Sequence, residues 1–307
     1  MKTAIITGSS GQDGTYLSQH LNELGYRIIG INRSAKSIDL GDTHRVFDLI
    51  KETRPHEIYH LAAFHQSSQE KMLDDLEVLR KSNDIHVLAT ANLLEGIRRF
   101  CPSARFFFAA SSHMYGRTTI PIQDETIPFR PDNIYGITKV AGTHLCRYYR
   151  HNYNIFASVG ILYNHESPIR KADFISQKII KAEVAISMHH QDKLILGDLD
   201  AEIDWGYAGD YVVAMQRILQ LPDPGEFIIS SGEQHKVQDF VEEAFKQVGL
   251  DWKQYVQIDL SLLNNQKKVT FLDSQFLLAK LTDWKPRVSF SALIKLMIQK
   301  ELEKHSG

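Results

Sequence analysis

The apolar positions at the start of the chain change from a continuous run to a helical repeat. Ala4, Ile5 and Ile6 form a short apolar run that is typical of a buried strand. Beyond Gly14, one face recurs at helical spacing as far as Gly25, a residue type that commonly ends a helix. This face comprises Tyr16, Leu17, His20, Leu21 and Leu24. The pattern predicts a strand, a turn and a helix in immediate succession.

Similar runs and stripes recur along the rest of the chain. They predict strands over residues 27–33, 57–63, 105–116 and 227–231, and helices over residues 73–99 and 237–245. Strands that alternate with helices indicate an α/β fold: a Rossmann-type doubly wound parallel sheet with a smaller C-terminal α/β substrate lobe. We expect the sheet domain to span residues 1–163, with residues from about 198 to 232 returning to it, and the lobe to take mainly residues 164–307.

Composition and charge narrow the class of protein. With 307 residues and 43% hydrophobic content, the chain can bury a large core. The net charge of −2 gives no reason to expect attraction to nucleic acid or to a membrane. Cys101 and Cys146 are too few for a disulfide scaffold and lack metal-ligand spacing, so no metal site is expected. No run approaches the roughly 18 apolar residues of a membrane span. We expect a soluble, cytoplasmic protein.

Three glycines follow the first predicted strand in G-x-x-G-x-x-G spacing. Gly8 permits a tight turn, Gly11 lets the backbone approach a pyrophosphate, and Gly14 lets the helix pack closely on the strand. Gln12 and Asp13 lie within this loop. An ordinary glycine turn is the alternative, but the strand before it and the helix after it favour a dinucleotide-binding start.

The end of the second predicted strand bears on the choice of cofactor. An acidic residue there would bind the ribose hydroxyls of NAD, whereas Arg33 and Ser34 can hold the extra phosphate of NADP. Asp39 could accept a hydrogen bond from the adenine amino group, and Leu40 is expected to contact the cofactor beside it. We predict NADP. NAD remains possible if Arg33 is only a solvated strand-end residue.

The third predicted strand ends in Leu61, Ala62 and Ala63, whose small side chains would let the backbone lie close to the cofactor. Ligands sit at the carboxyl ends of strands in such sheets. His86, within the long helical stripe, is interpreted as an ordinary helix residue because no partner spacing supports a metal site.

A catalytic set is indicated by two stretches of the sequence. Ser111 and His113 follow the fourth strand, and Tyr135 and Lys139 share one helix face at i and i+4. An ammonium near a phenol favours the phenolate, which gives a base for a hydroxyl proton, while Ser111 can hydrogen-bond the same oxygen. After a dinucleotide-binding start, this set indicates alcohol oxidation or carbonyl reduction by hydride transfer.

These residues together resemble the extended short-chain dehydrogenases that modify nucleotide sugars, and more closely the GDP-mannose 4,6-dehydratase family. The closer resemblance covers nearly the whole chain. It rests on residues 11–14 (Gly-Gln-Asp-Gly), residues 160–168 (Gly-Ile-Leu-Tyr-Asn-His-Glu-Ser-Pro), residues 197–201, 204–206 and 210–212, and residues 284–286.

The resemblance implies a reaction cycle. Tyr135 and NADP+ would oxidise the sugar at C4, a base would remove the C5 proton, water would leave from C6, and hydride would return to C6. The sequence departs from the family at two catalytic positions, because Ser111 stands where the family has threonine and His113 where it has the glutamate base. A histidine can shuttle a proton near neutral pH.

The resemblance also implies substrate contacts by Asn164, Glu166, Ser167, Arg170 and Lys178 for a nucleotide sugar. Two arginines of the family are replaced here, by Ile169 and by Ile203. The diphosphate would then be met by Arg170, Lys171 or Lys178. The family's long loop after the second strand is largely missing between Arg33 and Asp39, so a homodimer is expected rather than a tetramer.

Three functions stay open at this point. The first is a nucleotide-sugar 4,6-dehydratase that acts on GDP-mannose or a related GDP-sugar. The second is an oxidoreductase or epimerase on the same kind of substrate, without loss of water, because His113 replaces the carboxylate. The third is a cofactor-binding protein that has lost turnover, against which the complete set of Ser111, Tyr135 and Lys139 argues.

Overall fold

The larger part of the molecule is built on a parallel sheet of six strands. The computed structural model describes residues 1–32, 38–65, 73–116, 122–259, 261, 272–273 and 276–305. The strands are β1 (Thr3–Thr7), β2 (Arg27–Ile31), β3 (Glu57–His60), β4 (Arg105–Ala109), β6 (Ala157–Leu162) and β11 (Glu226–Ile229), in the order β11-β6-β4-β3-β1-β2. Every neighbouring pair is parallel. The predicted α/β fold with a parallel central sheet is confirmed.

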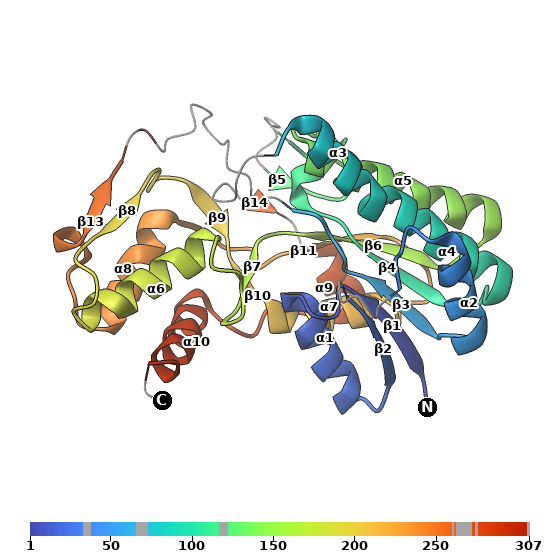
Figure 1. Cartoon of the computed structure of the whole chain (residues 1–307), viewed down its shortest axis with the longest axis horizontal. Coiled ribbons are helices and arrows are strands. Elements are labelled where there is room, and N and C mark those ends of the chain that lie inside the picture. The colour runs from blue at the N-terminus through green and yellow to red at the C-terminus, as the bar shows by residue number, and fades with distance from the viewer. Residues whose placement is uncertain are drawn as a thin grey trace.

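Helices cover both faces of this sheet (Figure 1). One layer holds α2 (Thr43–Thr53), α3 (Asp75–Asn83), α4 (Ala89–Phe100) and α5 (Ile134–Tyr153), and the other holds α1 (Gln12–Glu23), α7 (Ala208–Ile218) and α9 (Phe276–Thr282). The single helix expected over residues 73–99 is interrupted, because a π-helical turn η1 (Asp84–Leu88) joins α3 to α4. The 3-10 turn η2 (Ser112–Met114) follows β4.

The second lobe has an apolar core of its own, formed mainly by α6 (Ile175–Ser187), α8 (Val237–Gln247) and α10 (Phe290–Glu303). Short strand pairs surround these helices: β7 (His165–Glu166) with β10 (Gly206–Tyr207), β9 (Glu202–Asp204) with β12 (Gln234–Lys236), and β8 (Leu194–Leu196) with β13 (Val256–Ile258). The 3-10 turn η3 (Trp252–Gln254) precedes β13, and β5 (Ile122–Gln123) pairs with β14 (Leu272–Asp273). Within residues 198–232, α7 and β11 pack with the large sheet.

The chain returns to the large sheet a second time near its end, which the sequence did not indicate. Leu278 of α9 and Trp284 are buried in the same apolar cluster as α1 and α7. Among the described residues, no helix combines the length and the apolar character that crossing a membrane requires.

One carboxyl group lies inside the apolar core of the second lobe. Glu183 on α6 has no exposed surface, and neither of its side-chain oxygens has a hydrogen-bond partner among the described residues. Burial disfavours the ionised form and raises the pKa of Glu183 from its ordinary value of 4.5 to about 8. The folded protein therefore keeps this proton at pH values at which the unfolded chain has lost it.

Glu183→Gln is expected to stabilise the protein at alkaline pH. Between pH 4.5 and about 8 the folded state binds the extra proton, so the free energy of unfolding falls as the pH rises through this window. A shift of this size corresponds to a loss on the order of 5 kcal/mol. Urea denaturation at about pH 5 and about pH 9 should show a gain for the variant at the higher pH only. Glu242→Gln, at an exposed position on α8, is the matched control; equal effects of Glu183→Gln at both pH values would contradict this prediction.

Candidate active site

The site lies where the carboxyl ends of the sheet strands face the second lobe (Figure 1). β1 pairs with β2 on one side and with β3 on the other. The chain therefore builds the sheet outward from β1 in both directions. Ligands of open parallel sheets bind at such a topological switch point. The loops after β1, β3 and β4 therefore define the place to look for a cofactor and for catalytic groups.

The loop after β1 is a close-packed glycine cradle. Gly8 has φ of +74°, a left-handed conformation that favours glycine, and a Cβ there would lie 2.9 Å from the backbone nitrogen of Ala62. A Cβ on Gly14 would lie 2.2 Å from the carbonyl oxygen of Gly8. The N-cap of α1 is Gly11, which has no side chain to cap the helix. First-turn amides have no partner within a helix, so the cradle fits a pyrophosphate.

Of the other predicted cofactor residues, some pack directly against this cradle and others make different contacts. Leu61, Ala62 and Ala63 follow β3, and the backbone of Leu61 and Ala62 packs directly against Gly8. The carboxylate of Asp39 accepts a hydrogen bond from the Gly41 amide at 2.9 Å. The Leu40 side chain is buried in the apolar core of the sheet. Arg33 and Ser34, on which the prediction of NADP depends, lie outside the described residues.

The structure brings the four predicted catalytic residues together beside β4. Ser111 is buried at the end of β4, and its side chain is hydrogen-bonded to the hydroxyl of Tyr135. Tyr135 and Lys139 lie one turn apart on α5, with the Lys139 Nζ 5.5 Å from the Tyr135 ring centroid. The spacing of i and i+4 thus places both side chains on the face of α5 that packs against the sheet.

The sequence predicted that the Lys139 ammonium favours the phenolate of Tyr135, but the surroundings of Lys139 differ from this expectation. Its Nζ donates to the Ala109 carbonyl oxygen at 2.6 Å, and burial lowers the pKa of Lys139 to about 7. Burial also raises the pKa of Tyr135 to about 12, and the opposing influences are the Arg170 guanidinium and the hydrogen bond with Ser111. The phenol of Tyr135 therefore keeps its proton near neutral pH until a neighbouring charge changes.

His113 stands on the solvent side of the same tyrosine. Its backbone amide donates to the Ser111 side-chain oxygen at 3.2 Å, and its Nδ1 lies 3.2 Å from the side-chain nitrogen of Asn133. The His113 ring meets the Tyr135 ring edge-on, with centroids 5.7 Å apart. His113 therefore places an exposed imidazole next to the tyrosine.

Two further histidines contact the Tyr135 ring. The sequence placed His65 in a loop at the carboxyl end of the third strand, where ligands sit, but it indicated a catalytic role for neither histidine. The rings of His65 and His86 meet it edge-on, with centroid distances of 5.0 Å and 5.2 Å. His65 also stacks on Phe174 of the second lobe at 5.6 Å. His65 is otherwise exposed. Desolvation of its ring by these neighbours, followed by the charge of His113, lowers the pKa of His65 to about 4. His65 is thus a neutral imidazole beside the tyrosine.

His86 is a buried member of a hydrogen-bond network rather than an ordinary helix residue. Its Nε2 accepts from the Phe64 amide at 3.1 Å, and its Nδ1 lies 2.8 Å from the Thr138 side-chain oxygen. Since Nε2 accepts, Nδ1 must carry the hydrogen. Burial, followed by the charge of Lys139, lowers the pKa of His86. His86 is neutral and ties η1 to α5 directly behind Tyr135.

The strap of residues 164–168, which joins the large sheet to the second lobe, is bonded to the glycine loop. Gln12 donates to the His165 carbonyl oxygen at 3.0 Å and accepts from the Ser167 hydroxyl at 2.7 Å. The side chain of His165 meets the carboxylate of Asp13 at 3.0 Å. Two stretches that are about 150 residues apart thus form one polar network.

The predicted substrate residues occupy different surroundings. Glu166 is buried and contacts Ser176 at 2.6 Å and Arg170 at 3.3 Å. The Arg170 guanidinium stacks on the Phe174 ring at 3.5 Å, which places it near His65. Asn164 is exposed and Lys178 on α6 is half-buried. Ile203 packs against the core of the second lobe, and Ile169 is exposed. Arg170 is therefore the cation nearest to Tyr135 from this lobe.

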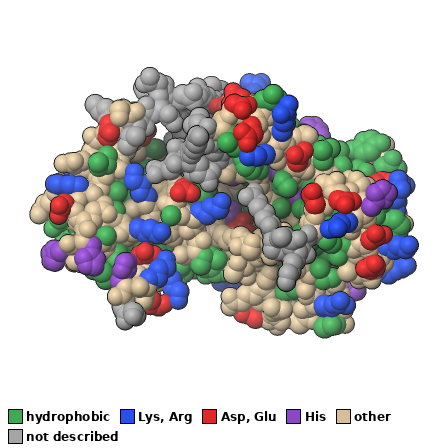
Figure 2. Space-filling view, in the orientation of Figure 1, with side chains coloured by type: hydrophobic (Ala, Val, Ile, Leu, Met, Phe, Trp, Pro, Cys, Tyr) green, Lys and Arg blue, Asp and Glu red, His purple; other side chains and the backbone are tan. Residues whose placement is uncertain are grey.

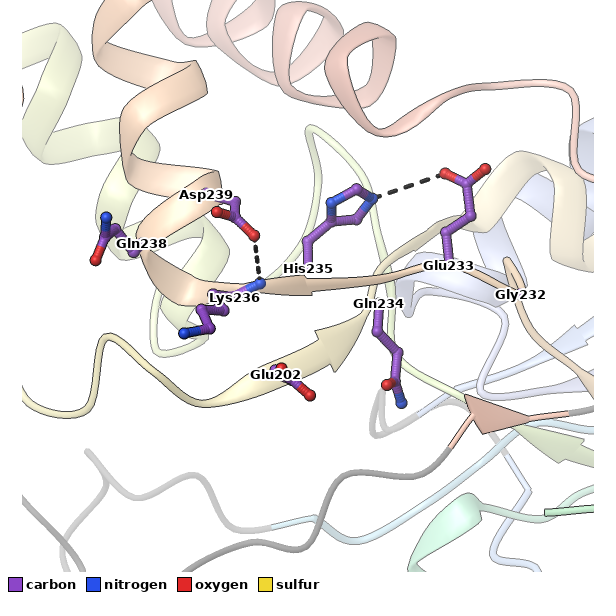
Figure 3. Close-up of a pocket in the computed structure, with 8 residues that line it drawn as sticks. All are labelled: Glu202, Gly232, Glu233, Gln234, His235, Lys236, Gln238 and Asp239. Atoms are coloured by element: carbon purple, nitrogen blue, oxygen red, sulfur yellow. Dashed lines mark hydrogen bonds and ion pairs between the residues drawn. The ribbon is translucent and has the colours of Figure 1, made fainter. Parts of the chain in front are cut away.

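A cavity of about 810 Å³ lies elsewhere on the second lobe, along β12 and the start of α8 (Figure 3). Its lining includes the carboxylates of Glu202, Glu233 and Asp239, and a single lysine, Lys236, which forms an ion pair with Asp200 at 2.8 Å. A diphosphate prefers the opposite balance of charge. The cavity contains none of the residues around Tyr135. Among the described residues, no cluster of His, Cys, Asp or Glu could hold a metal ion.

The cradle, the tyrosine and the lysine on this fold define an extended short-chain dehydrogenase, the class of NAD(P)-dependent dehydratases and epimerases. The sequence model of a family described as GDP-mannose 4,6 dehydratase matches residues 5–297. The chain belongs to the GDP-mannose 4,6-dehydratase family, as its sequence predicted.

Individual relatives agree with this assignment. GDP-mannose 4,6 dehydratase 2 of Arabidopsis thaliana is 34% identical over 331 residues, covering 98% of this chain and 87% of the relative. GDP-mannose 4,6 dehydratase of Homo sapiens is 33% identical over 345 residues, covering 98% and 91%. The solved structure of RMD from Pseudomonas aeruginosa complexed with NADPH has a TM-score of 0.86 at 21% identity, covering 99% of this chain and 100% of that one. This last similarity concerns the fold.

Proposed function

We propose that the protein is an NADP-dependent nucleotide-sugar 4,6-dehydratase acting on GDP-mannose or a related GDP-sugar. The observation that carries the proposal is the contact of Ser111, Tyr135 and His113 at the carboxyl end of β4, in a chain of this family. The relatives named GDP-mannose 4,6 dehydratase support the choice of sugar.

The side chains have distinct tasks in this proposal. The glycine cradle would hold the dinucleotide pyrophosphate, and the nicotinamide, when bound, supplies reversible hydride transfer. Tyr135 is a phenol near neutral pH, and the positive charge of the oxidised nicotinamide, when bound, would favour its phenolate. The phenolate takes the proton of the C4 hydroxyl, and Ser111 holds the same oxygen. The resulting C4 ketone acidifies the C5 proton, which His113 removes. The C6 hydroxyl leaves with one proton as water, the hydride taken from C4 returns to C6, and a proton returns to C5, so the sugar loses one H2O in total.

A second candidate is an oxidoreductase or epimerase that stops before water is lost. The observation in its favour is His113 itself, because an imidazole offers one basic nitrogen where the family has a carboxylate. Its Nδ1 is 3.2 Å from the side-chain nitrogen of Asn133.

Incubating the purified protein with GDP-mannose and NADP tests the proposal. We expect a nucleotide sugar that is lighter by one water and has incorporated solvent deuterium at C5. A ketosugar that keeps its C6 oxygen and shows no exchange at C5 would replace the dehydratase by the second candidate. No reaction, with cofactor binding intact, would favour a protein that has lost turnover.

The cofactor preference is a separate prediction. Because Arg33 and Ser34 stand where an acidic residue would select NAD, the protein should bind NADP more tightly than NAD. Arg33→Asp should move the preference toward NAD. Fluorescence titration with both dinucleotides measures this, and a clear NAD preference of the parent protein would contradict it.

The homodimer is also part of the proposal. Exposed apolar side chains lie on the neighbouring helices α3 and α5, namely Leu76, Leu79, Ile137, Tyr148 and Tyr153. Figure 2 shows apolar side chains gathered over the C-terminal end of α5. A second copy of the chain could cover this face. Cys101 and Cys146 are free thiols, in keeping with the proposed cytoplasmic location.

A further inference from the structure

A partly buried ion pair joins the phosphate-binding end of α1 to the strap of residues 164–168. His165 Nε2 lies 3.0 Å from each carboxylate oxygen of Asp13, and His165 Nδ1 lies 2.8 Å from the Tyr163 carbonyl oxygen. A carbonyl and an ionised carboxylate can only accept, so both ring nitrogens carry hydrogen. His165 is therefore an imidazolium that balances the charge of Asp13.

The groups around His165 agree with this charge state. Burial alone would lower the pKa of His165, but the Asp13 carboxylate outweighs burial and raises it. Burial would likewise raise the pKa of Asp13, and His165 lowers it. Arg170 faces the imidazolium as a second cation, and Tyr211 of α7 stacks on the ring with centroids 4.6 Å apart. The Tyr211 hydroxyl in turn contacts Asp204 at 3.4 Å.

The position of Asp13 gives this pair a consequence for the cofactor. Asp13 lies in the first turn of α1, between Gly11 and Gly14 of the cradle. A pyrophosphate at this helix end is attracted by the first-turn amides, but an unbalanced carboxylate in the same turn repels it. We propose that protonated His165 is a positioning residue for the dinucleotide, which neutralises Asp13 and holds the strap against the cradle.

The hydrogen bonds beside the pair make the same connection without charge. Gln12 is hydrogen-bonded to the His165 carbonyl oxygen and to the Ser167 hydroxyl, as described above. These two hydrogen bonds also hold the strap against the cradle. When His165 loses its proton, Asp13 regains an unbalanced charge and the strap loses its ionic contact. Cofactor affinity should therefore fall as the pH rises, and cofactor binding should stabilise the proton on His165.

Titration of NADP alone, without any sugar, tests this inference independently of the proposed reaction. The extra phosphate of NADP is fully ionised above about pH 7, so its own titration does not interfere. As the pH is raised from about 7 into the alkaline range, where His165 loses its proton, the dissociation constant of the parent protein should rise on the order of tenfold. Lys139, with a pKa lowered to about 7, contributes to this dependence, so the comparison with variants decides.

His165→Gln removes the charge and should weaken NADP binding at about pH 7 on the order of tenfold, leaving only the weaker pH dependence of other groups. Asp13→Asn with His165→Gln removes both charges and should restore most of the affinity. His190→Gln, at an exposed turn of the second lobe, is the matched control. Parent-like affinity and pH dependence in His165→Gln would overturn the inference. If His165→Gln fails to fold, the double variant, which leaves no unpaired charge, is decisive: a pH dependence equal to that of the parent would overturn the inference.

Discussion

Tyr135→Phe is expected to lower turnover by about 10²-fold or more while cofactor binding stays unchanged, the usual scale for loss of a general acid or base. The variant loses the hydroxyl that is hydrogen-bonded to Ser111. The ring keeps its edge-on contacts with His65, His86 and His113, so the packing of α5 is preserved. Steady-state rates and NADP titration on the same preparation separate catalysis from binding.

Tyr148→Phe is the control for Tyr135→Phe, because Tyr148 is an exposed tyrosine on the same helix. Its turnover should equal that of the parent. Turnover of Tyr135→Phe at the parent level would remove Tyr135 from the mechanism. Weakened NADP binding in that variant would instead show that the hydroxyl serves the cofactor.

His113→Ala should abolish dehydration and C5 hydrogen exchange but spare a single half-turn of C4 oxidation. The reason is that Ser111 and Tyr135 remain in place, whereas the C5 proton has no acceptor. NADPH absorbance reports the half-turn, and deuterium incorporation measured by mass spectrometry reports the exchange. His113→Glu, which restores the carboxylate of the family, should keep or raise dehydratase activity.

His144→Ala, an exposed histidine on α5, controls for removal of an imidazole from this region. Persistence of C5 exchange in His113→Ala would move the base to another group. His65 is then the next group to test, because its neutral ring lies 5.0 Å from the Tyr135 ring. Loss of the half-turn as well would mean that His113 positions the sugar rather than shuttling a proton.

Features that depend on neighbouring residues in the chain could be predicted from the sequence. The glycines at positions 8, 11 and 14 meet the backbone contacts that their spacing requires. Tyr135 and Lys139 share a face of α5 because i and i+4 positions always do. The alternation of strands and helices likewise indicated the parallel sheet.

Features that depend on packing between distant segments could not be predicted from the sequence. The direction of the Lys139 ammonium is decided by the carbonyl of Ala109 on a neighbouring strand. The pair of Asp13 and His165 joins residues that are 152 positions apart, and neither residue type signals the other. The resemblance named Arg170 as a candidate substrate contact, but only the fold shows that its charge acts on Tyr135.

The π-helical turn η1 limits how the length of this chain can vary. A π turn accommodates one residue more than an α-helical turn, and here it includes His86, while the Ile85 carbonyl accepts from His60 at 2.9 Å. Removing one residue from 84–88 would turn this π turn into an α-helical turn, so α3 and α4 on either side would keep their relative rotation. The buried stripe of α4 would then keep its place, but the contacts that the Ile85 carbonyl makes with His60 and that His86 makes with Thr138 would shift. A single-residue deletion in this helix should therefore disturb the packing of α4 less within these five residues than at any other position.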